Sequence, residues 1–160
     1  MEEETLREGL ERLFQSYCQT AEGLFYSAEK VEPLIFIVQR EEDQLGFAYA
    51  VPVIQDKDML AQIVQHLCIT TNAVAGVIVS EAWTAKIRKD EIWDGTPPSK
   101  RLDREETLQV VLFSKVINKM KIWKIVRKEG KNKYLEPEQT SDSSDPIYSR
   151  FFGNYFRVDA

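Results

Sequence analysis

The sequence predicts an α+β fold in which two helices pack on a mainly antiparallel sheet of about five or six strands, in the order α-β-β-α-β-β-β-β. Three observations lead to this prediction. Two segments carry apolar residues at helical spacing. The other apolar segments are short and rich in strand-forming residues. Several links between them are of hairpin length, which favours antiparallel pairing and a two-layer arrangement.

The first half of the chain supplies both helices. An apolar stripe predicts the first helix over residues 5–27. The segment 34–52 contains two apolar runs separated by a polar turn, as expected of a β-hairpin. Asp56 or Asp58 can then cap a second helix that continues to about Thr70.

The second half of the chain supplies the remaining strands. Residues 74–85 are apolar on both faces at first, which predicts a central strand. A long polar connection, 88–106, leads to a second strand of this kind at 107–116. The segment 120–127 is a strand with interleaved lysines, and a tight turn then leads into a short apolar pair at 134–135.

The length of 160 residues is that of one domain. We expect residues 1–136 to form the α+β domain and residues 137–146, rich in Ser, Asp and Pro, to form a polar linker. The segment 147–160 is aromatic and is expected to dock on the domain or on a partner in a homodimer. Its aromatic residues at helical spacing are Phe151, Phe152, Tyr155 and Phe156.

Composition limits the class of protein. Charged residues make up 29% of the chain and the net charge is −5. No apolar run approaches the ~20 residues that span a bilayer, so no membrane is expected. The chain opens Met1-Glu2-Glu3-Glu4, unlike a secretory signal, and has only two cysteines, Cys18 and Cys68. Reduced thiols and a cytoplasmic location are therefore expected.

The strongest site candidate lies at the end of the 74–85 strand. Period-two alternation places Glu81 and Trp83 on one face, so the carboxylate needs a polar partner. Antiparallel return of the next strand brings the 88–106 connection close to it, which makes Arg104 the expected partner. The catalytic candidates are Glu81, Asp103, Arg104 and Glu105, with Trp83 and Arg101 as ligand-binding candidates. The alternative is an ion pair that only holds the connection in place.

These residues also carry a resemblance. Ser80-Glu81-Ala82-Trp83, then Pro98-Ser99 and Asp103-Arg104-Glu105, and the strand that follows resemble a group of small uncharacterised bacterial and phage-type proteins. The likeness covers about residues 74–127. It implies a shared fold and a shared pocket, and it implies no reaction.

A basic band, residues 115–133, is the second candidate site. It holds eight basic residues and one acidic residue, Glu129. The side chains that could follow a phosphate backbone are Lys119, Lys121, Lys124, Arg127 and Lys128, with Trp123 available to stack on bases. Alternatively, the lysines guard an exposed sheet edge. The acidic composition of the whole chain argues against nucleic acid.

Other chemistry has little basis in the sequence. His66 and Cys68 are two apart on the second helix and point in different directions, and no metal-ligand spacing or nucleotide-binding motif occurs. We therefore expect no cofactor and a non-catalytic binding or interaction role. The alternatives are a small hydrolase or transferase that uses Glu81 as general base with Arg104, and a nucleic-acid-binding module.

Overall fold

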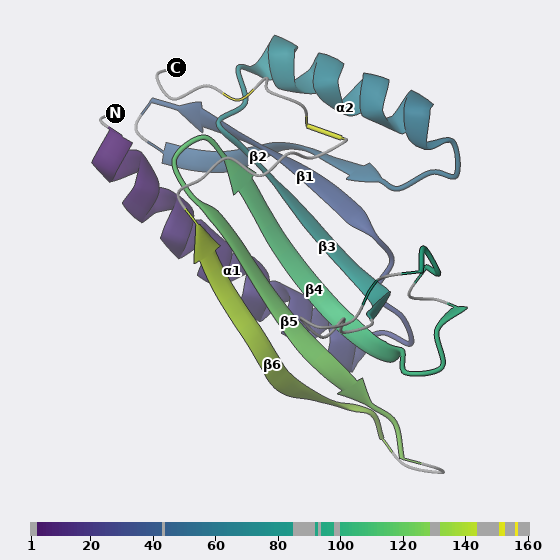
Figure 1. Cartoon of the computed structure of the whole chain (residues 1–160). Coiled ribbons are helices and arrows are strands. Elements are labelled where there is room, and N and C mark those ends of the chain that lie inside the picture. Colours follow the sequence, from purple (N-terminus) through teal and green to yellow (C-terminus); the bar gives the residue numbers. More distant parts are fainter. Residues whose placement is uncertain are drawn as a thin grey trace.

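The computed structural model describes residues 3–42, 44–84, 92, 94–97, 100–128, 132–143, 151–152 and 156 (Figure 1). Two helices and six strands follow one another along the chain. They are α1 (Glu3–Ser27), β1 (Leu34–Glu41), β2 (Gln44–Pro52), α2 (Lys57–Thr71), β3 (Ala75–Thr84), β4 (Glu105–Ser114), β5 (Asn118–Val126) and β6 (Tyr134–Ser143).

The six strands form one sheet in the order β2-β1-β3-β4-β5-β6, and every neighbouring pair is antiparallel. This confirms the predicted α+β fold and its element order. β3 and β4 lie in the middle, which agrees with their apolar character on both faces. The tight turn between β4 and β5 is closed by Ser114, whose hydroxyl accepts from the Ile117 amide at 2.9 Å.

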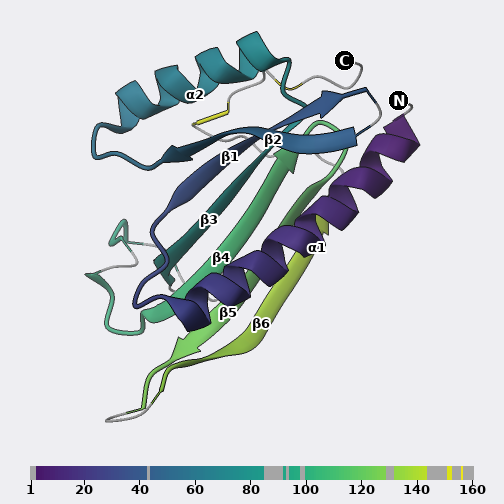
Figure 2. The ribbon, with the colours of Figure 1, turned by 180° about the vertical axis from the view of Figure 1, so that it is seen from behind.

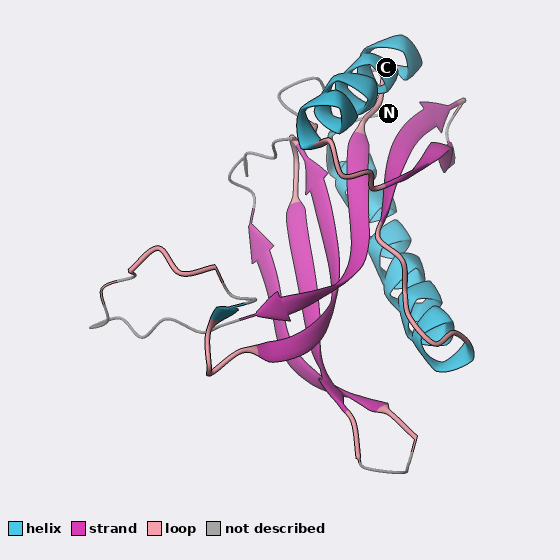
Figure 3. Cartoon of the chain, turned by 90° about the vertical axis from the view of Figure 1, so that its right-hand side faces the viewer, coloured by secondary structure: helices cyan, strands magenta, loops and turns pink. Residues whose placement is uncertain are grey.

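The two helices cover opposite faces of the sheet, so the expected two-layer packing is wrong. α1 packs with Val77 and Val79 of β3 and with the matching positions of β4, on what we call the α1 face. α2 packs with Ile35 and Ile37 of β1 on the other face, the α2 face. The view from behind in Figure 2 and the side view in Figure 3 show α1 along one side of the sheet. Strands that are apolar on both faces require cover on both sides.

Capping residues and buried stripes explain both helices. The buried side of α1 includes Leu6, Leu10, Phe14 and Phe25, spaced so that one stripe faces the sheet. α2 begins at its N-cap Asp56, whose carboxylate accepts from the Met59 amide at 3.0 Å. Asn72 ends α2 in the left-handed conformation, with φ 51°. Short polar residues adopt that conformation more readily than most.

The predicted linker is wrong over much of its length, because Tyr134–Ser143 form strand β6. Its main chain pairs with β5 from Val126↔Tyr134 to Asn118↔Ser143. Backbone hydrogen bonds do not require apolar side chains, and an edge strand tolerates polar residues. Pro137 lies beside a register shift in the ladder, where a missing amide does least harm.

The C-terminal aromatic residues that the structure describes pack on the α2 face of their own domain. Phe152 is fully buried and Phe156 nearly so. The Phe152 ring lies 5.4 Å from that of Phe113 and 5.2 Å from that of Phe156. Gly76 of β3 makes room for it, since a Cβ at this position would lie 2.2 Å from the Phe152 ring. Tyr155 falls outside the described residues, and the buried Phe152 is not available to a homodimer partner.

Gly76→Ala should therefore lower the free energy of unfolding by about 1–3 kcal/mol through overpacking, and Phe152→Ala by about 3–5 kcal/mol through loss of a buried ring. The two effects should be less than additive, because the smaller side chain at 152 leaves room for the new methyl group. Urea unfolding measures the free energy of unfolding of the two single variants and of the double variant. Gly23→Ala is the matched control: it lies in α1 with no atom near its missing Cβ, and it should stabilise the protein by about 1 kcal/mol. Additive losses would mean that Phe152 does not lie on Gly76.

Candidate functional site

A concavity of about 850 Å³ opens on the α1 face at the end of β3. It exists because β3 extends beyond both β1 and α1. β1 begins at Leu34, which pairs with Val79, so β3 continues five residues past the start of β1. α1 has already ended at Ser27 and does not cover this part of the sheet. The lining residues are Glu29, Lys30, Glu32, Glu81, Ala82, Trp83, Glu106, Ile125 and Arg127.

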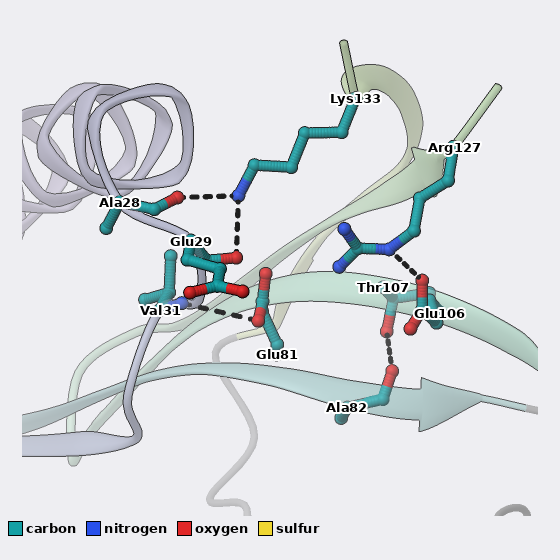
Figure 4. Close-up of polar contacts among 9 residues, drawn as sticks. All are labelled: Ala28, Glu29, Val31, Glu81, Ala82, Glu106, Thr107, Arg127 and Lys133. Carbon is teal, nitrogen blue, oxygen red and sulfur yellow. Dashed lines mark hydrogen bonds and ion pairs between the residues drawn. The ribbon is translucent and has the colours of Figure 1, made fainter. Parts of the chain in front are cut away.

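Glu81 is the least satisfied polar group of the concavity. Its Oε2 accepts from the amide of Val31 at 3.3 Å, a long bond for an N–H donor (Figure 4). Its Oε1 is buried and has no hydrogen-bond partner in the described chain. A buried carboxylate oxygen without a hydrogen-bond donor costs free energy. The site therefore has capacity for one or more further hydrogen-bond donors.

Trp83 forms one wall of the concavity and is 41% exposed. The guanidinium carbon of Arg104 lies 4.3 Å from the centre of its ring, a cation–π contact. The expected pair between Glu81 and Arg104 is therefore wrong: Glu81 takes its hydrogen bond from Val31, and Arg104 packs on the indole. The indole of Trp83, rather than the carboxylate of Glu81, binds the planar cation of Arg104.

Charged residues from distant parts of the chain surround the opening. Arg127 donates from Nε to Glu106 at 2.7 Å. Lys133 donates to the carbonyls of Ala28 and Glu29 at 2.7 and 3.1 Å, where α1 ends. A cation there offsets the negative end of the helix dipole. Figure 4 shows this turn, Glu81 and the Glu106–Arg127 pair around the same space. The lining side chains comprise four carboxylates and two cations.

The remaining predicted site residues lie elsewhere. Arg101 and Asp103 bind each other, at 2.8 and 2.9 Å, and this pairing lowers the pKa of Asp103. Glu105 is one residue along β4 from Glu106, which places it on the α2 face, 3.8 Å from Lys124. Because Glu105 is on the other side of the sheet, the four catalytic candidates do not form one constellation.

The basic band is divided in the same way. Lys119 and Lys121 lie on the α1 face, over the rings of Phe14 and Trp123. Lys124 lies on the opposite face, Arg127 pairs with Glu106, and Lys128 lies over the ring of Tyr134. Trp123 is only 1% exposed, so the prediction that it stacks on bases is wrong. The lysines of the band that the structure describes make no continuous track along one face.

The thiols and the histidine add no second site. Burial raises the pKa of Cys18 to about 11 and that of Cys68 to about 12, so neither thiol is ionised at neutral pH. His66 lies on the outer side of α2. Within the residues that the structure places, no three His, Cys, Asp or Glu side chains are arranged to hold a metal ion. Neither of the helices described is long and apolar enough to cross a membrane.

Sequence reasoning found Glu81 and Trp83 and missed most of their surroundings. The turn after α1 contributes Glu29, Lys30 and Glu32, none of which is a sequence candidate. On β4 the sequence candidate is Glu105, whereas the lining residue is Glu106. The run of charges between the first helix and Pro33 was a usable signal for the turn. To predict Glu106 as a lining residue, one must know that it pairs with Trp83, and no local sequence pattern gives that register.

No family model matches the chain, and no match was found among curated proteins or solved structures. The interpretation of the site therefore depends on its own geometry.

If the concavity is more than structural, Glu81→Gln should leave the free energy of unfolding unchanged or raise it by up to about 1 kcal/mol. The amide keeps an oxygen for Val31 and removes a poorly compensated charge. Glu106→Gln, which weakens a partly exposed pair with Arg127, should cost about 0–1 kcal/mol. Urea unfolding at neutral pH compares the two. A loss of about 3 kcal/mol or more at Glu81 would instead assign the carboxylate a structural role.

Proposed function

We propose that this chain is a non-catalytic binding protein that holds a cationic group, an ammonium or a guanidinium, in the concavity beside Glu81 and Trp83. The observation that carries the proposal is the Glu81 carboxylate, which has one long hydrogen bond and a buried oxygen without a partner in the described chain. A ligand that donates hydrogen bonds supplies what the fold leaves out. The terminal torsion of a glutamate is soft, so its oxygens can turn toward the opening.

The charge around the concavity supports a cation. Four glutamates line it against Lys30 and Arg127, and Arg127 is already paired with Glu106. The carbonyl end of α1 adds negative potential here, although Lys133 already binds the carbonyls of Ala28 and Glu29. Helix C-termini attract positive charge. An anionic ligand would meet repulsion from most of these groups.

Trp83 supports a cation for a second reason. Indole rings bind cations through their electron-rich faces, and this ring already carries the guanidinium of Arg104 on it. Arg104 is not among the residues that line the concavity, so it supports the wall from outside. The ligand would lie between the indole and the glutamate, with an apolar stem along the ring.

The other candidate functions have weaker support. Catalysis by Glu81 with Arg104 required the two side chains to meet, and they contact different groups. Nucleic-acid binding required a track of cations with an exposed ring, and Trp123 is buried. A cytoplasmic location, in keeping with two free cysteines, and kinship with small bacterial or phage-type proteins are parts of the same proposal.

Agmatine, which carries both an ammonium and a guanidinium, is the probe that tests the proposal. Isothermal titration calorimetry at low salt should detect saturable binding to the unmodified protein, with little or none for butyrate or n-butanol. Glu81→Gln should weaken agmatine at least about tenfold, since a charge-assisted hydrogen bond contributes about 1.5–3 kcal/mol. Trp83→Leu should weaken it by a smaller factor through loss of the cation–π contact.

Glu8→Gln serves as the matched control, because it removes the same charge from an exposed position on α1 outside the concavity. It should change the affinity less than about twofold, through long-range electrostatics alone. Equal weakening by Glu81→Gln and Glu8→Gln would mean that agmatine responds only to net charge. The absence of agmatine binding to the unmodified protein would remove the proposal.

A further inference from the structure

The stretch from Gln44 to Ser80 is unusually poor in charge. Its only charged side chains are Asp56, Lys57 and Asp58, although charged residues make up 29% of the chain. The stretch is nonetheless at the surface, because it contains an edge strand and the outer side of α2. Depletion of charge together with exposed aromatic residues and methionine is typical of protein–protein interfaces.

Large apolar side chains on this stretch are exposed. On β2, Phe47 is 61% exposed and Tyr49 is 49% exposed. On α2, which packs beside β1 and β2, Met59 is 52% exposed and Ile63 is 41% exposed. α2 carries no charged residue after Asp58. A helix that faced only water would be expected to carry charges on its outer side.

The ladder between β1 and β2 places the two aromatic rings on opposite faces of the sheet. Val38 pairs with Phe47 and Ile37 pairs with Tyr49, with a register shift between them. Val38 belongs to the core on the α1 face and Ile37 to the core on the α2 face. Phe47 therefore flanks the edge on the α1 side, beside the Phe36 ring at 6.0 Å, and Tyr49 flanks it on the α2 side. Among the described strands β2 is at the edge of the sheet, and this edge has an exposed ring on each side.

The two edges of the sheet differ in a way that matters for association. β6 carries Glu136 and Pro137, both exposed, features that discourage pairing with another strand. β2 carries no charge over its nine residues, and its only proline is the last residue, Pro52. β6 is thus protected by charge and proline, whereas the protective feature of β2 is the register shift at Ala48.

From this placement we infer that β2 is a self-association edge, at which a second copy of this chain pairs antiparallel with β2 to continue the sheet across a two-fold axis. Pairing would satisfy the outward backbone groups of β2 and place the two α2 helices on the same face of the joined sheet. Phe47 and Tyr49 of each copy would be covered on the two faces of the joined sheet.

The lack of charge on β2 permits a second copy to pair there. The protein has a net charge of −5, so two copies repel each other on average, and they approach most easily where charge is absent. A two-fold axis sets each β2 against an identical strand, and an uncharged strand meets no like charge there. The surface is self-complementary without any requirement for a particular partner sequence.

Size-exclusion chromatography with light scattering over about a hundredfold range of protein concentration tests the inference. The mass should rise from that of one chain, 18.5 kDa, toward twice this value. Tyr49→Lys and, separately, Phe47→Lys should weaken the association at least tenfold, since each sets like charges together at the axis. Leu24→Lys places the same charge on an exposed apolar residue of α1 and should leave it unchanged. Circular dichroism melting confirms that each variant is folded.

Hydrogen exchange separates pairing of the edges from another mode of association. In the dimer, outward amides of β2 should exchange at least tenfold more slowly than in the Tyr49→Lys variant, and β6 should not change. A chain that stays monomeric at every concentration would overturn the inference. So would a dimer that survives both lysine variants, or one in which the β2 amides gain no protection.

Discussion

Burial of β3 on both faces is the constraint on which the rest of the structure depends. Val77 and Val79 face α1, while Gly76 and Ile78 face α2 and the C-terminal aromatic residues. A strand of this kind cannot lie on a single layer of helix, because half of its apolar surface would remain in water. The chain covers the two faces with elements distant in sequence: α1 on one side, and α2 with Phe152 on the other. The pairing of β3 with both β1 and β4 then fixes its register.

The candidate site follows from where this double burial ends. β3 is longer than β1, and its last residues change from apolar to Glu81, Ala82 and Trp83. The turn after α1 crosses this overhang and gives the carboxylate one amide from Val31. At the same turn, Lys133 binds the carbonyls of Ala28 and Glu29 at the end of the helix. The fold thus holds a carboxylate that it does not fully satisfy, a pattern more typical of binding sites than of structural bridges.

Elements with a strong period could be predicted from the sequence, and elements held only by their neighbours could not. The stripes of α1 and α2 and the apolar strands β3 and β4 are visible in the residues themselves. β6 is a polar segment, so its sequence is typical of a linker. It forms a strand because its backbone pairs with β5. The two helices lie on opposite faces of β1. Phe36 and Val38 belong to the core under α1, and the alternating residues Ile35 and Ile37 belong to the core under α2.

Within the site, position on the sheet could be predicted and pairing could not. Alternation placed Glu81 and Trp83 together correctly, because it depends only on strand geometry. The prediction that Arg104 pairs with Glu81 assumes that a cation prefers a carboxylate, whereas the structure places Arg104 over the indole of Trp83. Glu105 and Glu106 are adjacent in sequence and lie on opposite faces of the sheet. The sequence prediction chose Glu105, whereas Glu106, one residue further along, lines the concavity.

The backbone amide of Val31 reports most directly on the central claim, that Glu81 is a carboxylate kept for a ligand. Its N–H is the one donor to Glu81 in the described chain, so its chemical shift in a ¹H–¹⁵N spectrum senses any new donor that reaches the carboxylate. Titration with methylguanidinium should move the Val31 resonance in a saturable way, and the same titration of the Glu81→Gln variant should not. A Val31 resonance that stays in place while other amides shift would contradict the account, because a bound cation would then lie away from Glu81.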